Sequence, residues 1–569
     1  MHLYLKIKIY GIGVCPKTLV GSDKPSWCFI DEIIINYILL KLNIKMNYIN
    51  ILKKTIFVLG GLLTVISCTS TKSKKEAQRP NILFIMSDDH TSQAWGIYGG
   101  TLKDYVQTPN ISKLANEGMV LNNSFCTNSI CVPSRATILT GQYSNRNGVY
   151  TLADALQPDS LNIAKVITKA GYQTAIIGKW HLKKEPAGFD YYNILEGQGR
   201  YWDPILRTAE NFHKNKENWD VHKGFSSDII TDLSIDWIEK RDKKKPFMLM
   251  THFKATHEPF DFPERYNDLY KNIEIPEPAS LLDFGAETTG RSFVGQKLEN
   301  LSLRWETASA DPEAWWCDYP ELPFSTQGLD SINARKKAYQ KLVKDFMRSG
   351  AAIDDNIGKL LDYLEAAGIA ENTVVIYTAD QGYFLGEHGF FDKRMIYEES
   401  LRMPFVIRYP KEIKGGQRID DIILNIDFPS LMADYAGIED PESFQGRSFR
   451  ENLKGNTPSD WRETAYFRYW EHSGDRPGHF GIRNKRYKLA FFYGQKVADI
   501  YGSKEVTSPA WEFYDLQKDP QELHNAYNDT EHASIVKEMK IELQKQRKIA
   551  GDTDNQRPKM QEIFKNYWN

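Results

Sequence analysis

The sequence predicts an α/β protein with a large, mixed, mostly parallel sheet between helices and a smaller C-terminal part of antiparallel strands and a helix. Continuous apolar runs alternate with amphipathic helical patterns from residue 81 onwards, which is typical of parallel strands covered on both faces. From about residue 464 the pattern changes to short aromatic segments separated by polar turns. A chain of 569 residues with 41% hydrophobic side chains has enough apolar material for a large core.

The predicted elements follow one another in a regular order. Residues 81–86 form a buried strand, and residues 108–125 hold a helix and then a second strand. A helix, a glycine and a strand follow within residues 161–180, and an apolar run marks another strand at 246–253. Residues 351–380 combine a long amphipathic helix, a glycine stop and a strand. The remaining expectations are an irregular insertion at 275–330, short antiparallel strands within 464–470, 479–493 and 511–525, and a polar helix at 533–549.

The charge argues against a nucleic-acid-binding protein, and the cysteine content argues against a disulfide-stabilised scaffold. The 72 basic and 74 acidic residues give a net charge of -2, whereas a protein whose main partner is nucleic acid normally carries a basic excess. Of the six cysteines, only Cys126, Cys131 and Cys317 follow the predicted export signal. This odd, sparse set does not make a disulfide framework, so a cysteine with special neighbours is a candidate for chemistry.

Residues 46–67 have the build of a bacterial export signal. Lysines precede a short apolar run, which cannot span a membrane as a mature helix, and a polar linker follows at 68–80. The residues before Cys68 resemble a lipobox, which implies cleavage there, lipidation of Cys68, and a protein of the periplasm or outer membrane that meets the membrane only through its lipid anchor. Residues 1–45 are interpreted as an over-called gene start. The body then divides into a catalytic domain at 81–445 and a C-terminal subdomain at 446–569.

Acidic and amide side chains follow two of the predicted strands. Asp88 and Asp89 follow the strand at 81–86, and Asp380 and Gln381 follow the strand that ends residues 351–380. Ligands of open α/β sheets bind outside the carboxyl ends of the strands, where three carboxylates and an amide oxygen need a cation between them. We expect one Ca²⁺ per chain, with Mg²⁺ as the less favoured alternative, because Ca²⁺ tolerates an irregular oxygen set better. Taken singly, an Asp pair is more often a cap and Asp-Gln-Gly a turn.

Basic side chains follow the other strands. Lys179 and His181 come after one strand, His257 comes after another, and Lys393 lies in the segment FFDKRMIYEES. Each of these residues alone is more simply a surface lysine or a core histidine with satisfied hydrogen bonds. Together with a metal cluster, they are what one bound anion requires.

The segment from Cys131 to Gly141, CVPSRATILTG, resembles the signature of the type I, formylglycine-dependent sulfatases, C-x-P-S-R-x-x-x-x-T-G. The paired Asp, GKWH, the H-x-P segment, the Asp-Gln-Gly turn and the Lys-Arg pair match in the family's order. The resemblance covers about residues 81–410, with weaker support through the C-terminal part. It implies an alkaline-phosphatase-like fold.

The resemblance also assigns roles to matching positions. Cys131, oxidised to formylglycine (3-oxoalanine), would be the nucleophile and a metal ligand, and Arg135 would hold the formylglycine oxygens and the ligand carboxylates. His257 would be the general acid for the departing sugar oxygen. Gln381 stands where Asn is commoner, and His90 has no assigned role. The other positions would complete the Ca²⁺ site (Asp88, Asp89, Asp380 and Gln381) or surround the nucleophile and the sulfate (Lys179, His181 and Lys393).

The chemistry of a sulfate ester agrees with these roles. A divalent cation and two ammonium groups stabilise the sulfuryl oxygens, and protonation of the alkoxide by an imidazole contributes about 10²–10⁴-fold. One hydroxyl of the aldehyde hydrate attacks sulfur, and the other expels the sulfate as the aldehyde re-forms. A helix predicted to begin near Pro133 directs its positive end at the same anion. The modification requires a maturase that recognises Pro133 and Arg135.

The substrate is expected to be a sulfated polysaccharide, with an algal glycan such as ulvan favoured over a glycosaminoglycan. Residues 188–204 resemble polysaccharide-acting members of the family. Substrate contacts are expected from Lys179, His257, Lys393, Gln198, Arg200, Tyr201 and Trp202, with His479 and Arg483 as further candidates. The alternatives are a phosphoester or phosphonate hydrolase of the same superfamily and a non-catalytic, glycan-binding surface lipoprotein. A thiol redox protein is disfavoured because no resolving cysteine lies close by.

Overall fold

The computed structural model describes residues 36–38, 40–43, 45–46, 79–283, 295–311, 318–439, 441, 443–497 and 502–568. The chain divides into two units, Met1–Gln78 and Arg79–Asn569. Apart from Met46, the predicted signal at 46–67 lies outside the described residues, as does Cys68. No helix among the described residues has both the length and the apolar content to cross a bilayer.

A ten-stranded mixed sheet forms the centre of the second unit in the described residues. Its five central strands, β9, β1, β8, β4 and β5, are parallel, and antiparallel pairs join β12 to β9 and β6 to β5. The predicted mostly parallel sheet is therefore confirmed. In spatial order the strands are β13 (Gln417–Ile419), β2 (Met119–Leu121), β12 (Phe405–Arg408), β9 (Thr373–Ala379), β1 (Asn81–Asp88), β8 (Phe247–Thr256), β4 (Gln173–Lys179), β5 (Tyr191–Leu195), β6 (Ile205–Arg207) and β7 (Asp220–Val221).

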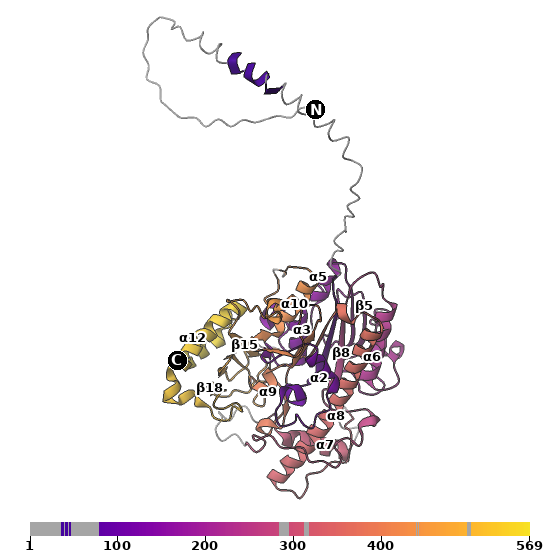
Figure 1. Cartoon of the computed structure of the whole chain (residues 1–569). Coiled ribbons are helices and arrows are strands. Elements are labelled where there is room, and N and C mark those ends of the chain that lie inside the picture. The colour runs from indigo at the N-terminus through magenta and orange to yellow at the C-terminus, as the bar shows by residue number, and fades with distance from the viewer. Residues whose placement is uncertain are drawn as a thin grey trace, which may run out of the picture. The chain divides into compact units, whose positions relative to one another are not determined.

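Helices cover both faces of this sheet (Figure 1). Successive side chains of a strand point to opposite faces, so Ile82 and Phe84 of β1 join one apolar core while Leu83 and Ile85 join the other. This is why β1 reads as an unbroken apolar run rather than an alternating one. One face carries α3 (Cys131–Thr140), α5 (Ile163–Lys169) and α10 (Phe428–Tyr435), and the other carries α2 (Pro109–Asn116), α6 (Ser226–Lys240) and α8 (Ser331–Ala366).

The C-terminal part is the predicted antiparallel sheet with its helix. Its elements are β15 (Thr464–Tyr469), β16 (His479–Asn484), β17 (Tyr487–Phe492), β18 (Ala510–Asp515), α12 (Ala533–Ala550) and α13 (Pro558–Tyr567). Figure 1 shows α12, β15 and β18 gathered beside the large sheet. The apolar side chains of this small sheet belong to the same core cluster as α3 and α10, so the two sheets share one hydrophobic interior.

The segment predicted to be irregular at 275–330 contains a helix, α7 (Leu298–Ala310). Its Leu298, Leu301 and Trp305 recur at helical spacing, are fully buried, and belong to one apolar cluster with residues of α8. The prolines and acidic residues around α7 obscure this pattern in the sequence. The remaining short strands and α-helices of the described residues are β3 (Ser124–Phe125), β10 (Phe384–Leu385), β11 (Phe391–Asp392), β14 (Ile423–Leu424), α4 (Ser144–Asn147), α9 (Glu398–Leu401) and α11 (Arg450–Leu453).

Candidate active site

The predicted polar residues converge at the carboxyl ends of four neighbouring strands. Asp88 ends β1, Lys179 ends β4, Asp380 follows β9, and His257 follows β8. Because β9, β1, β8 and β4 are adjacent and parallel, these side chains share one edge of the sheet. Asp89 has a left-handed backbone with φ 68°, a conformation that costs energy and is common at functional sites.

Three buried carboxylates form the centre of the site. One oxygen from each of Asp88, Asp89 and Asp380 lies within 4.8 Å of the others. Asp88 Oδ1 and Gln381 Oε1 are buried and accept no hydrogen bond from any described residue. Burial and the charge of Asp380 raise the pKa of Asp89 to about 6, against the opposing effect of Lys393. A hard divalent cation fits this oxygen set and its two unsatisfied acceptors, with Ca²⁺ or Mg²⁺ as the ions of choice.

Three cations balance the carboxylates. Arg135 Nε donates to Asp380 Oδ2 at 2.9 Å, and its Nη2 lies 3.6 Å from Asp88 Oδ1. Lys179 Nζ contacts Asp88, and Lys393 Nζ contacts Asp89. Arg135 also donates to the Lys179 carbonyl at 2.8 Å, which ties the start of α3 to the end of β4. With every one of these side chains buried, the site is a dense, nearly neutral cluster of paired charges.

Cys131 is the first residue of α3 and faces this cluster. Its side chain is buried, and its Sγ lies within 4.8 Å of ligand atoms of Asp88 and His257. Gln381 Nε2 lies 3.8 Å from the sulfur. Burial raises the pKa of the Cys131 thiol to about 12, so the unmodified side chain is a protonated, weak nucleophile at neutral pH. The conversion of this residue to formylglycine stays a prediction.

His257 and His181 lie beside the cluster in different settings. His257 Nδ1 hydrogen-bonds the Glu258 carbonyl at 2.8 Å, so its Nε2, 4.0 Å from Asp89 Oδ2, is the nitrogen that faces the site. Burial and the nearby charges of Lys393 and Lys179 hold the pKa of His257 well below its ordinary value. His181 has a left-handed φ of 59°, and burial together with Lys179 also lowers its pKa.

His90 has no role assigned from the sequence, and in the structure it stabilises the carboxyl ends of β1 and β9. Its Nδ1 lies 2.6 Å from the Tyr377 hydroxyl, which also bonds Ser87. Burial lowers the pKa of His90 to about 3, so the ring is neutral. It links the end of β1 to β9.

Sequence reasoning missed a network behind His257. Arg304 Nη1 donates to both carboxylate oxygens of Glu258, at 3.0 and 2.7 Å, and Tyr319 also contacts that carboxylate. Glu258 is the residue whose carbonyl orients His257, so α7 is anchored to the loop that carries the imidazole. Arg304 lies 46 positions away in a segment predicted to be irregular, and no local pattern signals it. Lys254, three residues before His257, was also missed; its buried ammonium group lies 5.0 Å from the Tyr201 ring.

The loop between β5 and β6 places the predicted sugar contacts beside the cluster. Gln198 Oε1 accepts a hydrogen bond from Lys179 Nζ at 2.6 Å, and the Tyr201 hydroxyl donates to the His257 carbonyl at 2.6 Å. Arg200 and Trp202 are exposed. All four side chains line one cavity of about 750 Å³.

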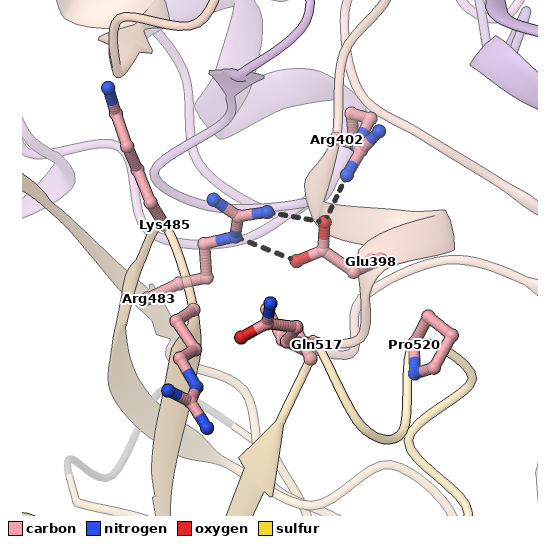
Figure 2. Close-up of a pocket in the computed structure, with 8 residues that line it drawn as sticks. Glu398, Arg402, Arg483, Lys485, Gln517 and Pro520 are labelled. Atoms are coloured by element: carbon pink, nitrogen blue, oxygen red, sulfur yellow. Dashed lines mark hydrogen bonds and ion pairs between the residues drawn. The ribbon is translucent and has the colours of Figure 1, made fainter.

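The two C-terminal candidates have partners of their own. His479 is buried in β16, where its ring stacks on Phe492 with centroids 4.7 Å apart. Arg483 Nε and Nη2 pair with both oxygens of Glu398, at 3.1 and 3.2 Å, in the pocket drawn in Figure 2. The structure thus brings Arg483 to the helix that follows the Lys393 segment, and the proposed contacts of His479 and Arg483 with a sugar stay predictions.

Comparisons with known proteins agree with this geometry. The family model described as Sulfatase matches residues 80–438, and the model described as N-sulphoglucosamine sulphohydrolase, C-terminal, matches residues 386–549. An N-acetylglucosamine-6-O-sulfatase of Bacteroides thetaiotaomicron is 38% identical over 94% of this chain and 96% of its own length. A solved structure in complex with its substrate D-glucosamine-2-N,6-O-disulfate is similar with a TM-score of 0.74 and 38% identity, covering 84% of this chain and 99% of that one. An ulvan-active sulfatase of Formosa agariphila is 25% identical over 86% of each chain.

Proposed function

The chain belongs to the sulfatase family and is a sulfuric ester hydrolase, and we propose that it removes the 6-O-sulfate of an N-substituted glucosamine in a glycosaminoglycan-type oligosaccharide. The observation that carries the proposal is the 38% identity to an N-acetylglucosamine-6-O-sulfatase over nearly the whole of both chains. The similar structure with bound glucosamine disulfate supports the same class of sugar.

The proposed chemistry uses the residues at the carboxyl ends of the strands. Cys131, matured to formylglycine, would supply the nucleophile, and a Ca²⁺ held by Asp88, Asp89, Asp380 and Gln381 would supply positive charge for the sulfuryl oxygens. Lys179 and Lys393 would exchange their contacts with carboxylates for contacts with the sulfate oxygens, because the divalent cation then balances the acids. Arg135 holds Asp380 and Asp88 in place. The His257 imidazole would become the general acid once the anionic sulfate offsets the charges of Lys393 and Lys179, because these charges lower its pKa and its Nε2 must carry a proton to protonate the leaving sugar oxygen.

The ulvan preference expected from the sequence is not confirmed. The ulvan-active relative is 25% identical, against 38% for the glucosamine-directed one. Ulvan oligosaccharides therefore serve as a competing substrate in the test.

Sulfate release by protein co-expressed with a formylglycine-generating maturase tests the proposal. We expect turnover of N-acetylglucosamine 6-sulfate, little release from its 3-O- and 4-O-sulfated isomers, and no phosphate release from an aryl phosphate. Mass spectrometry of the Cys131 peptide should show aldehyde in place of thiol, and chelation of divalent cations should abolish turnover until Ca²⁺ is returned. Preferential desulfation of ulvan, or activity without conversion of Cys131, would overturn the corresponding part of the proposal.

We also propose that the protein is exported and lipid-anchored through Cys68, in the periplasm or outer membrane. The lipobox-like residues before Cys68 support this proposal, and they lie outside the described residues. Metabolic labelling with a radioactive fatty acid should label the wild-type chain and leave Cys68→Ala unlabelled. Equal labelling of both chains would contradict the lipid anchor.

A further inference from the structure

The cavity beside the carboxylate cluster is larger than one sulfated sugar requires. At about 750 Å³ it lies in the upper part of the roughly 300–1,000 Å³ range of pockets that hold drug-sized ligands. Gln198 and Tyr201 line it, and Gln198 also accepts a hydrogen bond from Lys179 while Tyr201 donates one to the His257 carbonyl, so the cavity adjoins the carboxylate cluster. Lys216 and Trp219, which follow β6 in the sequence, also line the cavity.

The charges that line this cavity are of two kinds. Two lining acids are paired with cations outside the lining: Glu196 with Arg207 at 2.6 Å, and Asp203 with Lys223 at 2.7 Å. In contrast, the exposed side chains of Arg200 and Lys216 have no ion-pair partner among the described residues.

The lining therefore carries a small surplus of positive charge. Beyond the two paired acids, it contains the basic residues Arg200, Lys216 and Lys254 against the acids Asp261 and Asp318, a net charge of about +1. Of these basic residues, the exposed Arg200 and Lys216 are placed to attract an anionic ligand, while the carboxylates of Asp261 and Asp318 can accept hydrogen bonds from hydroxyl groups.

Two tryptophans add apolar surface to the same cavity. Trp202 is 40% exposed, and its ring packs edge-on against Phe225 with centroids 5.3 Å apart, which fixes its orientation. Trp219 is partly exposed, and the Arg207 guanidinium lies 4.5 Å from its ring. Aromatic rings with one apolar face in a polar cavity suit the C–H face of a pyranose.

We propose that this cavity binds an anionic sugar, a uronic acid or a sulfated pyranose, linked to the sugar whose sulfate ester is hydrolysed. Arg200 and Lys216 hold the acid group, the tryptophans pack against the ring, and Asp261 and Asp318 accept hydroxyl hydrogen bonds. The enzyme then acts on an oligosaccharide in preference to a free monosaccharide. This inference rests on the proposed function, which places the sulfated sugar at the carboxylate cluster.

The test compares a 6-sulfated glucosamine monosaccharide with three disaccharides that extend it by a uronic acid, by the same sugar with its carboxyl group reduced, or by a sulfated neutral sugar. We expect kcat/KM to be about tenfold higher for the two anionic disaccharides than for the reduced one, the effect of one charge-assisted contact. The ratio between the two anionic arms shows whether carboxylate or sulfate is the ligand. Equal kcat/KM for all three disaccharides would overturn the inference.

Substitution of one lining residue tests whether the preference for anionic disaccharides comes from this cavity. Lys216→Ala should remove most of the preference for the anionic disaccharides and leave monosaccharide turnover unchanged. Lys214→Ala is the matched control, because this exposed lysine is two residues away and does not line the cavity. An unchanged preference in Lys216→Ala, or an equal loss in Lys214→Ala, would contradict the assignment.

Calorimetric binding to the unmodified Cys131 form, with Ca²⁺ present, separates the two proposals. Tighter binding of the anionic disaccharides supports the cavity assignment even if no 6-O-sulfate is released, in which case only the proposed function fails. If sulfate is released from the monosaccharide but the disaccharides bind equally tightly, the proposed function stands and only the cavity assignment is overturned.

Discussion

Arg135 is expected to be the electrostatic partner of Asp380 and a second partner of Asp88 in the absence of a metal ion. Its guanidinium donates to Asp380 at 2.9 Å and lies 3.6 Å from Asp88, and the side chains of all three residues are at most 2% exposed. Removing one partner of a buried ion pair leaves an uncompensated charge and costs about 3–5 kcal/mol. For a unit the length of Arg79–Asn569, unfolding with an entropy of about 2.1 cal/mol/K per residue, that cost lowers Tm by roughly 3–5 °C.

The assay is thermal unfolding of Arg135→Met and wild type, each produced without maturase so that both keep the Cys131 thiol. In EDTA we expect the variant to unfold about 3–5 °C lower. In excess Ca²⁺ the difference should shrink, because a divalent cation replaces the lost positive charge and stabilises the native state to which it binds.

Arg468→Met is the matched control. Arg468 pairs with Asp552 and Asp554 at 2.7 and 2.8 Å in the C-terminal part, and all three side chains are at most 2% exposed. Its variant should lose a similar amount of stability, with or without Ca²⁺. If the Tm of Arg135→Met differs from that of wild type by the same amount in EDTA and in Ca²⁺, or in neither, then Arg135 does not supply charge that a bound cation can replace.

Three further predictions concern the nucleophile and the general acid. Burial raises the pKa of the Cys131 thiol from 9.0 to about 12 and also shields its sulfur from reagents. At pH 8, peptide mass spectrometry should therefore find iodoacetamide labelling of Cys131 slower in the folded protein than in denaturant, by roughly two orders of magnitude or more. Equal rates would contradict the burial. Cys131→Ala should abolish sulfate release and keep the far-ultraviolet circular dichroism of the wild type, whereas residual turnover would remove this residue as nucleophile. Arg304→Met should lower kcat about 10–100-fold with little change in KM and should shift the pH profile of kcat, because Arg304 holds Glu258 and, through it, His257. Arg304→Lys should recover part of the lost activity. If Arg304→Met changes only the stability of the protein, the ion pair has a structural role alone.

Most residues of the site could be predicted from the sequence, because each lies at or next to the end of a strand that has its own local pattern. Asp88, Lys179, His257 and Asp380 each come directly at or after a continuous apolar strand, and parallel strands joined by helices place their carboxyl ends on one edge. The spacing from Cys131 to Arg135 needs only one helical turn to put both side chains at the cluster. The helix α7 was not predicted, because four buried apolar side chains mark its only apolar face and the prolines and acidic residues around it suggest a loop.

The fold class and the kinds of group at the site could be predicted from the sequence: three carboxylates, an amide, two ammonium groups, a guanidinium, two imidazoles and one cysteine within a specific motif. Only the tertiary structure decided which groups meet. The strand order β9-β1-β8-β4 differs from the order along the chain and brings Lys179 to Asp88, and the packing of α3 against this sheet brings Arg135 to Asp380. The pairing of Arg304 with Glu258 and of Arg483 with Glu398 likewise joins segments tens of residues apart. The physical reason is that strand and helix patterns depend on near neighbours in the sequence, whereas long-range pairs depend on how complete faces pack into one core.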